Sequence, residues 1–193
     1  MDDQIEQARS RLCGLLLERS FKLGEFVLSS GRRSEYYVDC RTTTLHPGGA
    51  VLIVELMRPI LAEWRAEQVG GLTLGADPIV AAISYASGLQ AAGNAVPAFI
   101  VRKEAKSHGR GKQIEGCFEA GKRTVIVEDV ITTGESALRA VAAAREGGAE
   151  VVGVIAVVDR EEGGREAIEK EGLPVRSLFT ASELKAAAKG KRE

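Results

Sequence analysis

Apolar residues follow two alternating patterns along this chain, one typical of helices and one typical of buried strands. Between residues 2 and 20 they recur every three or four positions, as on one face of an amphipathic helix. Farther along, short β-branched runs alternate with helical stretches. The strands are predicted at 69–74, 96–101, 125–127 and 151–158, and the helices between them at 50–67, 77–93 and 135–146. Because continuous apolar runs suit parallel strands covered on both faces, we expect an α/β fold with a mainly parallel central sheet flanked by helices.

Turn and cap residues predict further elements before, within and after this core. Residues 22–39 change to aromatic and turn-forming types, which predicts short strands. Asp77 precedes a proline and is predicted to be the N-cap of the helix that follows. A short helix is expected at 166–171 and a strand at 175–179, and a basic tail from Lys185 onward is expected to fray.

The length of 193 residues suits one domain with a small elaboration rather than two full domains. We therefore expect a single domain over 1–193. The small elaboration, called the hood, would consist mainly of residues 1–45 plus C-terminal residues, and the core of the domain would span about 46–160.

The segment Thr124–Ser136 carries the most specific chemistry. The buried strand predicted at 125–127 runs into Glu128 and Asp129, which place two carboxylates at its carboxyl end. Thr132–Gly134 then offer hydroxyls, backbone N–H groups and a glycine free to take positive φ, just before a helix. A helix N-terminus attracts a phosphate, and the acids can accept hydrogen bonds from sugar hydroxyls. One segment can thus hold both ends of a phosphoribosyl group.

The alternative for this segment is an ordinary strand, turn and helix with solvated acids. It contains neither GxxxxGK[ST] nor GxGxxG, so folds that bind nucleoside triphosphates or dinucleotides are poor competitors. A strand, two acids, two apolar residues and Thr-Thr-Gly resemble the phosphoribosyl pyrophosphate (PRPP) motif of type I phosphoribosyltransferases. The resemblance implies PRPP contacts from Glu128, Asp129, Val130, Ile131, Thr132, Thr133, Gly134, Glu135 and Ser136.

Residues 102–116 form a long polar connection between two predicted strands. Most connections in compact domains need about six residues, so the length indicates a functional or disordered loop. The loop holds five basic and two acidic residues in a nearly neutral chain, which favours a polyphosphate, although a solvated surface loop would have a similar composition. Its R-K-E-A-K-x-H-G sequence resembles the catalytic loop of orotate phosphoribosyltransferases. The resemblance implies PRPP-binding and catalytic roles for Arg102, Lys103, Lys106 and His108.

Two further segments indicate where a base would bind. FVLSSGRRSEYYVD ends in Tyr36 and Tyr37, which suit stacking on a planar base, although a hairpin of packed aromatics is the alternative. It resembles the L-x-S-G-x-x-S-x-Y-Y hood of the orotate enzymes. Asp159–Gly163 resembles their D-R-x-E-x-G segment, although charges at a strand end are also ordinary. The resemblance implies orotate contacts from Tyr36, Tyr37, Thr132 and Arg160, with the guanidinium meeting the orotate carboxylate.

Composition and charge narrow the function further. The formal net charge of −1 does not favour nucleic acid or membranes as partners, and no apolar run reaches membrane-spanning length. Three distant cysteines without a CxxC pair argue against a disulfide framework, and we expect a cytoplasmic protein. Two histidines and one acid pair make no transition-metal cage. We assign His46 no role and expect Mg²⁺ to arrive with PRPP, bound mostly by ligand and water oxygens.

The four motifs occur in one order along most of the chain, and the chain is identified as a member of the orotate phosphoribosyltransferases. The resemblance implies a glycosyltransferase of pyrimidine biosynthesis that converts orotate and PRPP to orotidine 5'-monophosphate and pyrophosphate. It also implies a homodimer in which loop 102–116 is shared between subunits. The chain departs from many members at Ser29, where a lysine is common, and at 75–78, which lacks a tyrosine-lysine pair. The alternatives are a PRPP-sensing regulator without chemistry and an enzyme for a different base.

Overall fold

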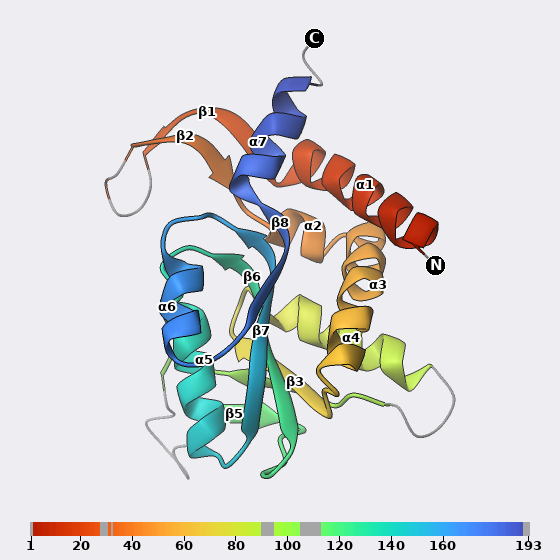
Figure 1. Cartoon of the computed structure of the whole chain (residues 1–193), viewed down its shortest axis with the longest axis vertical. Coiled ribbons are helices and arrows are strands. Elements are labelled where there is room, and N and C mark those ends of the chain that lie inside the picture. The colour runs from red at the N-terminus through yellow and green to blue at the C-terminus, as the bar shows by residue number, and fades with distance from the viewer. Residues whose placement is uncertain (1, 28–30, 32, 90–94, 105–112, 191–193) are drawn as a thin grey trace.

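A six-stranded sheet forms the centre of the molecule in the computed structural model (Figure 1), which describes residues 2–27, 31, 33–89, 95–104 and 113–190. The strand order is β5-β4-β3-β6-β7-β8, and every neighbouring pair is parallel except the antiparallel pair β4 and β5. This arrangement confirms the predicted mainly parallel sheet. The strands are β3 (Gln68–Leu72), β4 (Ala98–Val101), β5 (Ile114–Gly116), β6 (Arg123–Ile131), β7 (Glu150–Asp159) and β8 (Val175–Thr180).

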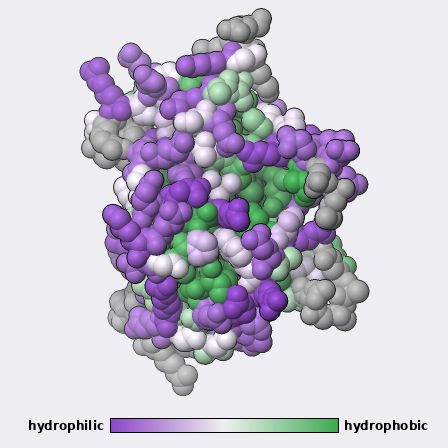
Figure 2. Space-filling model, in the orientation of Figure 1, coloured by the Kyte–Doolittle hydropathy of each residue, from purple (hydrophilic) through white to green (hydrophobic). Residues whose placement is uncertain are grey.

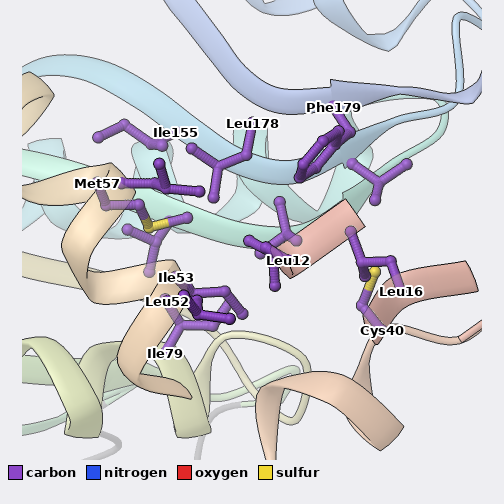
Figure 3. Close-up of a cluster of buried hydrophobic side chains, with 14 of the residues drawn as sticks. Leu12, Leu16, Cys40, Leu52, Ile53, Met57, Ile79, Ile155, Leu178 and Phe179 are labelled. Atoms are coloured by element: carbon purple, nitrogen blue, oxygen red, sulfur yellow. The ribbon is translucent and has the colours of Figure 1, made fainter. Parts of the chain in front are cut away.

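Helices cover both faces of the sheet, as parallel strands require. Alternate residues of β6 point to opposite sides, so Val125 and Val127 pack in one core cluster and Ile126 packs in the other. The first cluster joins the sheet to α1, α3, α4 and α7, and Figure 3 shows part of it around Met57. The second cluster joins the sheet to α5 and α6. The covering helices are α3 (Pro47–Glu63), α4 (Asp77–Gly88), α5 (Glu135–Glu146) and α6 (Gly164–Lys170).

The first and last helices of the chain pack together beside the sheet. The elements there are α1 (Asp2–Arg19), the antiparallel hairpin of β1 (Phe21–Val27) and β2 (Arg33–Val38), α2 (Arg41–Thr44), and α7 (Ala181–Gly190). Figure 1 shows α7 lying next to α1 and the hairpin, in agreement with the contacts among these elements. We call these five elements the hood.

The expected fraying of the tail from Lys185 is wrong for the described residues, because α7 continues to Gly190. The Thr180 backbone N–H donates to Glu183 Oε2 at 2.7 Å, and the Glu183 N–H donates to Thr180 Oγ1 at 3.2 Å. This reciprocal pair is a capping box, and it satisfies two backbone donors at the start of the helix. Leu184 is fully buried and fixes the helix to the core.

Other boundaries also differ from the sequence pattern. Helix α3 starts at Pro47, because proline suits the first helical turn, and it ends at Glu63 instead of 67. Helix α4 ends at Gly88, and the predicted closing residue Gly93 lies outside the described residues. The short elements α2 and β5 were not predicted. Figure 2 shows that polar side chains cover most of one face, with apolar surface exposed between them. Within the described ranges, every helix is too short or too polar to cross a membrane.

Candidate active site

The acid pair lies at the carboxyl end of the central strand β6. We expected Glu128 and Asp129 to follow the strand, but β6 continues to Ile131, so both acids belong to it. Strands β3 and β7 flank β6 in parallel. The carboxyl edge of such a sheet is where open α/β folds bind ligands. The pair is therefore placed at the edge where a substrate site is expected.

The buried Glu128 carboxyl group favours its neutral form. Only 5% of the residue is exposed. Burial and the neighbouring Asp129 carboxylate raise its pKa to about 9, while Lys103 acts in the opposite direction. Oxygen Oε2 is buried and has no hydrogen-bond partner among the described residues. The raised pKa favours the protonated form of Glu128, which can donate one hydrogen bond as well as accept.

A polar hollow opens where β6 turns into α5. It has a volume of about 60 Å³, and its lining consists of Glu128 and residues 130–137. Gly134 takes φ 81° as the N-cap of α5, and a Cβ there would lie 2.8 Å from the Gly164 carbonyl oxygen. Glycine is thus required by both conformation and space. The unpaired N–H groups of the first helical turn and the helix dipole make this hollow a site for an anion such as phosphate.

The turn between β3 and α4 joins the same edge, and the sequence pattern did not assign it to the site. A Cβ placed on Gly75 would lie 2.3 Å from Asp129 Oδ1. Asp77 was expected to be the N-cap of α4, but that expectation is wrong, since Ala76 is the cap and Asp77 is the first helical residue. The Thr73 hydroxyl donates to Asp77 Oδ2 at 2.7 Å. The turn therefore packs directly against the acid pair.

At the other end of the edge, Arg160 lies over the ring of Tyr36. Its Cζ is 4.8 Å from the ring centroid, and Phe21 stacks on the same ring at 5.2 Å. Arg160 Nε donates to Glu162 Oε1 at 2.7 Å. Its Nη2 is buried and has no partner among the described residues. Burial is the main cause that raises the pKa of the Tyr36 hydroxyl. The Tyr36 ring therefore packs against the Arg160 guanidinium, and the Nη2 of Arg160 is left to bind a ligand.

Tyr37 is more accessible than Tyr36. It is 42% exposed and lies in tilted contact with Phe26, with ring centroids 5.6 Å apart. Stacking of a base on either tyrosine stays a prediction. Tyr37 has the freer ring, because the Tyr36 ring contacts Phe21 and Arg160.

The loop after β7 holds Arg160 in place. The Arg160 backbone N–H donates to the Ile131 carbonyl at 2.9 Å, which ties this loop to the end of β6. The buried Asp159 carboxylate accepts from the Glu161 N–H at 2.8 Å and from Arg165 Nε at 2.9 Å. Both ends of the candidate site therefore depend on the same edge of β6 and β7.

The described part of loop 102–116 forms a stem. The Arg102 N–H donates to the Gln113 carbonyl at 2.9 Å, and Gln113 Nε2 donates to the Arg102 carbonyl at 3.2 Å. Lys103 lies close enough to influence the pKa of Glu128. The predicted catalytic residues Lys106 and His108 lie outside the described residues. The stem thus places Lys103 within electrostatic range of the acid pair.

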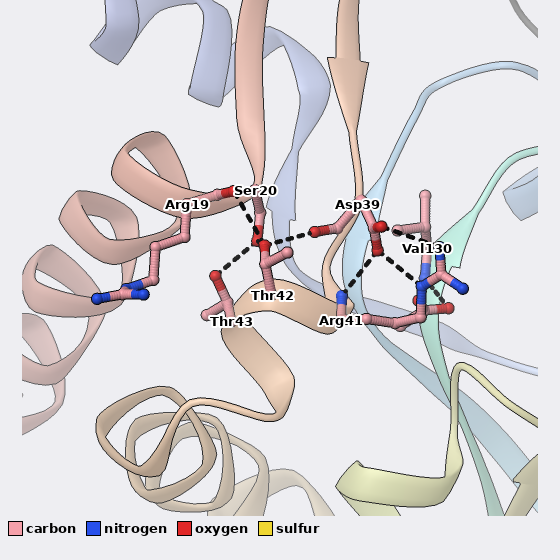
Figure 4. Close-up of polar contacts among 8 residues, drawn as sticks. Arg19, Ser20, Asp39, Arg41, Thr42, Thr43 and Val130 are labelled. Atoms are coloured by element: carbon pink, nitrogen blue, oxygen red, sulfur yellow. Dashed lines mark hydrogen bonds and ion pairs between the residues drawn. The ribbon is translucent and has the colours of Figure 1, made fainter.

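A polar cluster of hood residues is drawn with Val130 of β6 in Figure 4. The Ser20 hydroxyl contacts the hydroxyls of Thr42 and Thr43 at 2.9 and 2.6 Å. Arg41 forms two hydrogen bonds to Asp39, from Nε at 2.8 Å and from Nη2 at 2.9 Å. The bond from Arg41 is the main cause that lowers the pKa of Asp39. These contacts fix the end of β2 to α2 and to the end of α1 within the hood.

Comparison with known proteins identifies the arrangement. The family model for the phosphoribosyl transferase domain matches residues 72–177. The orotate phosphoribosyltransferase of Aquifex aeolicus is 52% identical over 179 residues, which cover 91% of this chain and 97% of that protein. The chain belongs to the orotate phosphoribosyltransferase family. The enzyme of Corynebacterium glutamicum is 50% identical over 92% of this chain and 94% of its own length.

Solved structures agree with this family and its fold. The Mycobacterium tuberculosis orotate phosphoribosyltransferase in complex with PRPP has a TM-score of 0.76 and 46% identity, covering 92% of this chain and 98% of that chain. Leishmania donovani UMP synthase has a TM-score of 0.79 and 28% identity, covering 94% of this chain and 38% of that one. The predicted type I phosphoribosyltransferase fold and the family are thus confirmed. The roles of individual site residues stay predictions.

Proposed function

We propose that this chain transfers the 5-phosphoribosyl group of PRPP to orotate, giving orotidine 5'-monophosphate and pyrophosphate in pyrimidine nucleotide synthesis. The observation that carries the proposal is the arrangement of one edge of the sheet. The buried Glu128, the half-buried Asp129 and an anion hollow lie at one part of it, and a guanidinium whose Nη2 has no partner among the described residues lies at another. Membership of the orotate phosphoribosyltransferase family supports the same reaction.

The acid pair and the hollow would bind PRPP. Backbone N–H groups and hydroxyls of residues 132–136 would hold the 5'-phosphate, with Val130 and Ile131 lining the approach. Glu128 and Asp129 would bind the ribose hydroxyls. With the pKa of Glu128 raised, the pair would donate to one ribose hydroxyl and accept from another, and it would present less negative charge to a polyanionic substrate.

Departure of pyrophosphate leaves positive charge on the ribose ring, so stabilisation of the leaving group matters more than a nucleophilic side chain. Arg102 and Lys103 at the loop stem would form part of a cationic wall, and Lys106 and His108 would complete it. Closure of the loop would also exclude water, which would otherwise hydrolyse PRPP.

Mg²⁺ fits this site as a substrate-borne ion. Among the residues that the structure describes, no cluster of three or more acidic, histidine or cysteine side chains is placed to hold a metal. The ion would therefore be bound mostly by PRPP and water oxygens, which is usual for magnesium. When bound, it neutralises charge on the departing pyrophosphate.

Orotate would bind at the hood side of the edge. The Nη2 of Arg160 would donate to its carboxylate, Thr132 would contribute a hydroxyl, and Tyr36 and Tyr37 would shape the pocket. The unsatisfied donor supports this assignment, since a buried guanidinium nitrogen without a partner is costly in the absence of a ligand.

A cytoplasmic homodimer completes the proposal. Several large apolar side chains are exposed on adjoining elements, as expected for a surface that a second copy covers. They are Leu45, Val51, Leu74, Tyr85 and Leu89. In such a dimer, loop 102–116 of one subunit would reach the site of the other. The near-neutral charge does not suggest nucleic acid or membrane partners.

Pyrophosphate release tests the reaction. The purified chain is mixed with PRPP and Mg²⁺, with and without orotate. We expect release that depends on orotate and matches orotidine 5'-monophosphate formation. No release, or release at the same rate without orotate, would contradict the proposal.

A further inference from the structure

Two cations from different segments meet on one aromatic ring of the hood. Lys185 of α7 places Nζ 5.2 Å from the centroid of the Tyr36 ring. The Cζ of Arg160 lies 4.8 Å from the same centroid. Both contacts fall within the range of cation–π attraction. The Tyr36 ring therefore contacts both an ammonium group and the guanidinium that we assign to the base.

The two cations differ in their partners. Arg160 pairs with Glu162 at 2.7 Å, and the two side chains are only 8% and 19% exposed. This pair has no net charge, although the Nη2 of Arg160 still lacks a partner. Across the described parts of the chain, Lys185 forms no ion pair with a carboxylate. Among the described residues, Lys185 is thus the cation on this ring that has no carboxylate bonded to it.

Helix α7 holds Lys185 in a fixed position relative to Arg160. Its first turn is closed by the capping box of Thr180 and Glu183, and Arg9 of α1 donates to Glu183 Oε1 at 2.6 Å. The Ser182 N–H donates to Glu161 Oε2 at 2.8 Å. Glu161 adjoins Arg160 and takes φ 60°, which is uncommon for a residue other than glycine. The helix and the Arg160 loop are therefore joined directly.

We propose that Lys185 is a second cation of the base end, and that with Arg160 Nη2 it selects a base that carries a carboxylate. The inference rests on the proposed function and deepens it. A carboxylate has two oxygens, so one can accept from Arg160 Nη2 while the other faces the Lys185 ammonium group. A neutral base gains nothing from that charge and leaves the donor unsatisfied, which disfavours it.

The test varies charge at this position with a matched control. Lys185→Met keeps an unbranched side chain over Tyr36 and removes the ammonium group, while Lys185→Arg keeps the charge. Lys189→Met removes an exposed lysine one turn farther along the same helix. Steady-state KM is measured for orotate at saturating PRPP and for PRPP at saturating orotate, together with the melting temperature.

We expect Lys185→Met to raise the KM for orotate roughly tenfold, as for loss of one charge-assisted contact, and to leave the KM for PRPP unchanged. Lys185→Arg and Lys189→Met should both stay near the parent values. An unaltered KM for orotate, or an equal rise in both KM values, would overturn the inference about Lys185. Turnover of orotate by the parent protein would still support the proposed function. If the parent protein uses only a neutral base, the inference about Lys185 and the proposed function are both wrong. If Lys185→Met lowers the melting temperature without a selective effect on the KM for orotate, Lys185 only stabilises the hood and the inference is overturned.

Discussion

Gly75 packs its backbone against the carboxylate of Asp129, so closely that a Cβ on Gly75 would lie 2.3 Å from Oδ1. The contact joins the turn after β3 to the acid pair at the end of β6. The local sequence around position 75 does not show that a residue without a Cβ is required there, because the restricting group is a carboxylate more than fifty residues away. The turn is therefore part of the site and sets the position of Asp129.

Replacement of Gly75 should displace that carboxylate. Overpacking costs about 1–3 kcal/mol, so we expect Gly75→Ala to lower kcat/KM for PRPP roughly tenfold. Gly88→Ala is the control, since a Cβ at Gly88 meets no atom within 4 Å. Full activity of Gly75→Ala would show that Asp129 does not need its observed position.

The raised pKa of Glu128 predicts a pH dependence of stability in the ligand-free protein. Its pKa rises from 4.5 to about 9 on folding, because of burial and the Asp129 carboxylate. Between these values the folded state binds one proton more than the unfolded state, so the free energy of unfolding falls as pH rises. Glu128→Gln should remove this part of the slope in urea denaturation between pH 5 and 8.5. The exposed Glu135→Gln should not alter the slope, and an unchanged slope in Glu128→Gln would contradict the assignment.

The guanidinium geometry of Arg160 should matter beyond its charge. Lysine keeps the charge but cannot donate to Glu162 and to a ligand carboxylate with one planar fork, so we expect Arg160→Lys to raise the KM for orotate roughly tenfold. The KM for PRPP should change little. Arg176→Lys, at an exposed arginine 3.6 Å from Glu63, serves as the control. Unaltered orotate saturation in Arg160→Lys would move the carboxylate site elsewhere.

Lys106 should act on the leaving group rather than on ground-state binding. Loss of one preorganised charge contact in a transition state reduces kcat by about 10²–10³, and we expect an effect of this order for Lys106→Ala. PRPP affinity, measured by calorimetry, should change much less. Lys170→Ala removes an exposed lysine from α6 as a control. Normal turnover of Lys106→Ala would remove the loop from the mechanism.

The central elements could be predicted because their signals are local. Helix α5 begins at Glu135 and ends at Glu146 as predicted, with glycine on both sides. The capping box of α7 was also present in the sequence, at Thr180 and Glu183, but the basic composition of the tail obscured it. By contrast, β5 is three residues long and exists through its pairing with β4, which no local pattern shows.

The candidate site also combines residues that a local sequence pattern reveals with residues that depend on tertiary contacts. The segment 128–136 is contiguous, so its order along the chain revealed the acid pair and the anion turn. Gly75, Glu162 and Lys185 act through partners distant in sequence or through a particular side-chain direction. Their contributions follow from tertiary packing, and the sequence pattern did not reveal them.

A comparison of bases most directly tests the central claim that the edge of β6 and β7 joins PRPP to orotate. The purified protein receives PRPP and Mg²⁺ with orotate, uracil, adenine, hypoxanthine or guanine in separate reactions, and nucleotide formation is followed. We predict turnover with orotate alone. Turnover with another base would contradict the base-end assignment, and PRPP binding without turnover on any base would contradict the enzymatic account and favour a PRPP-sensing regulator.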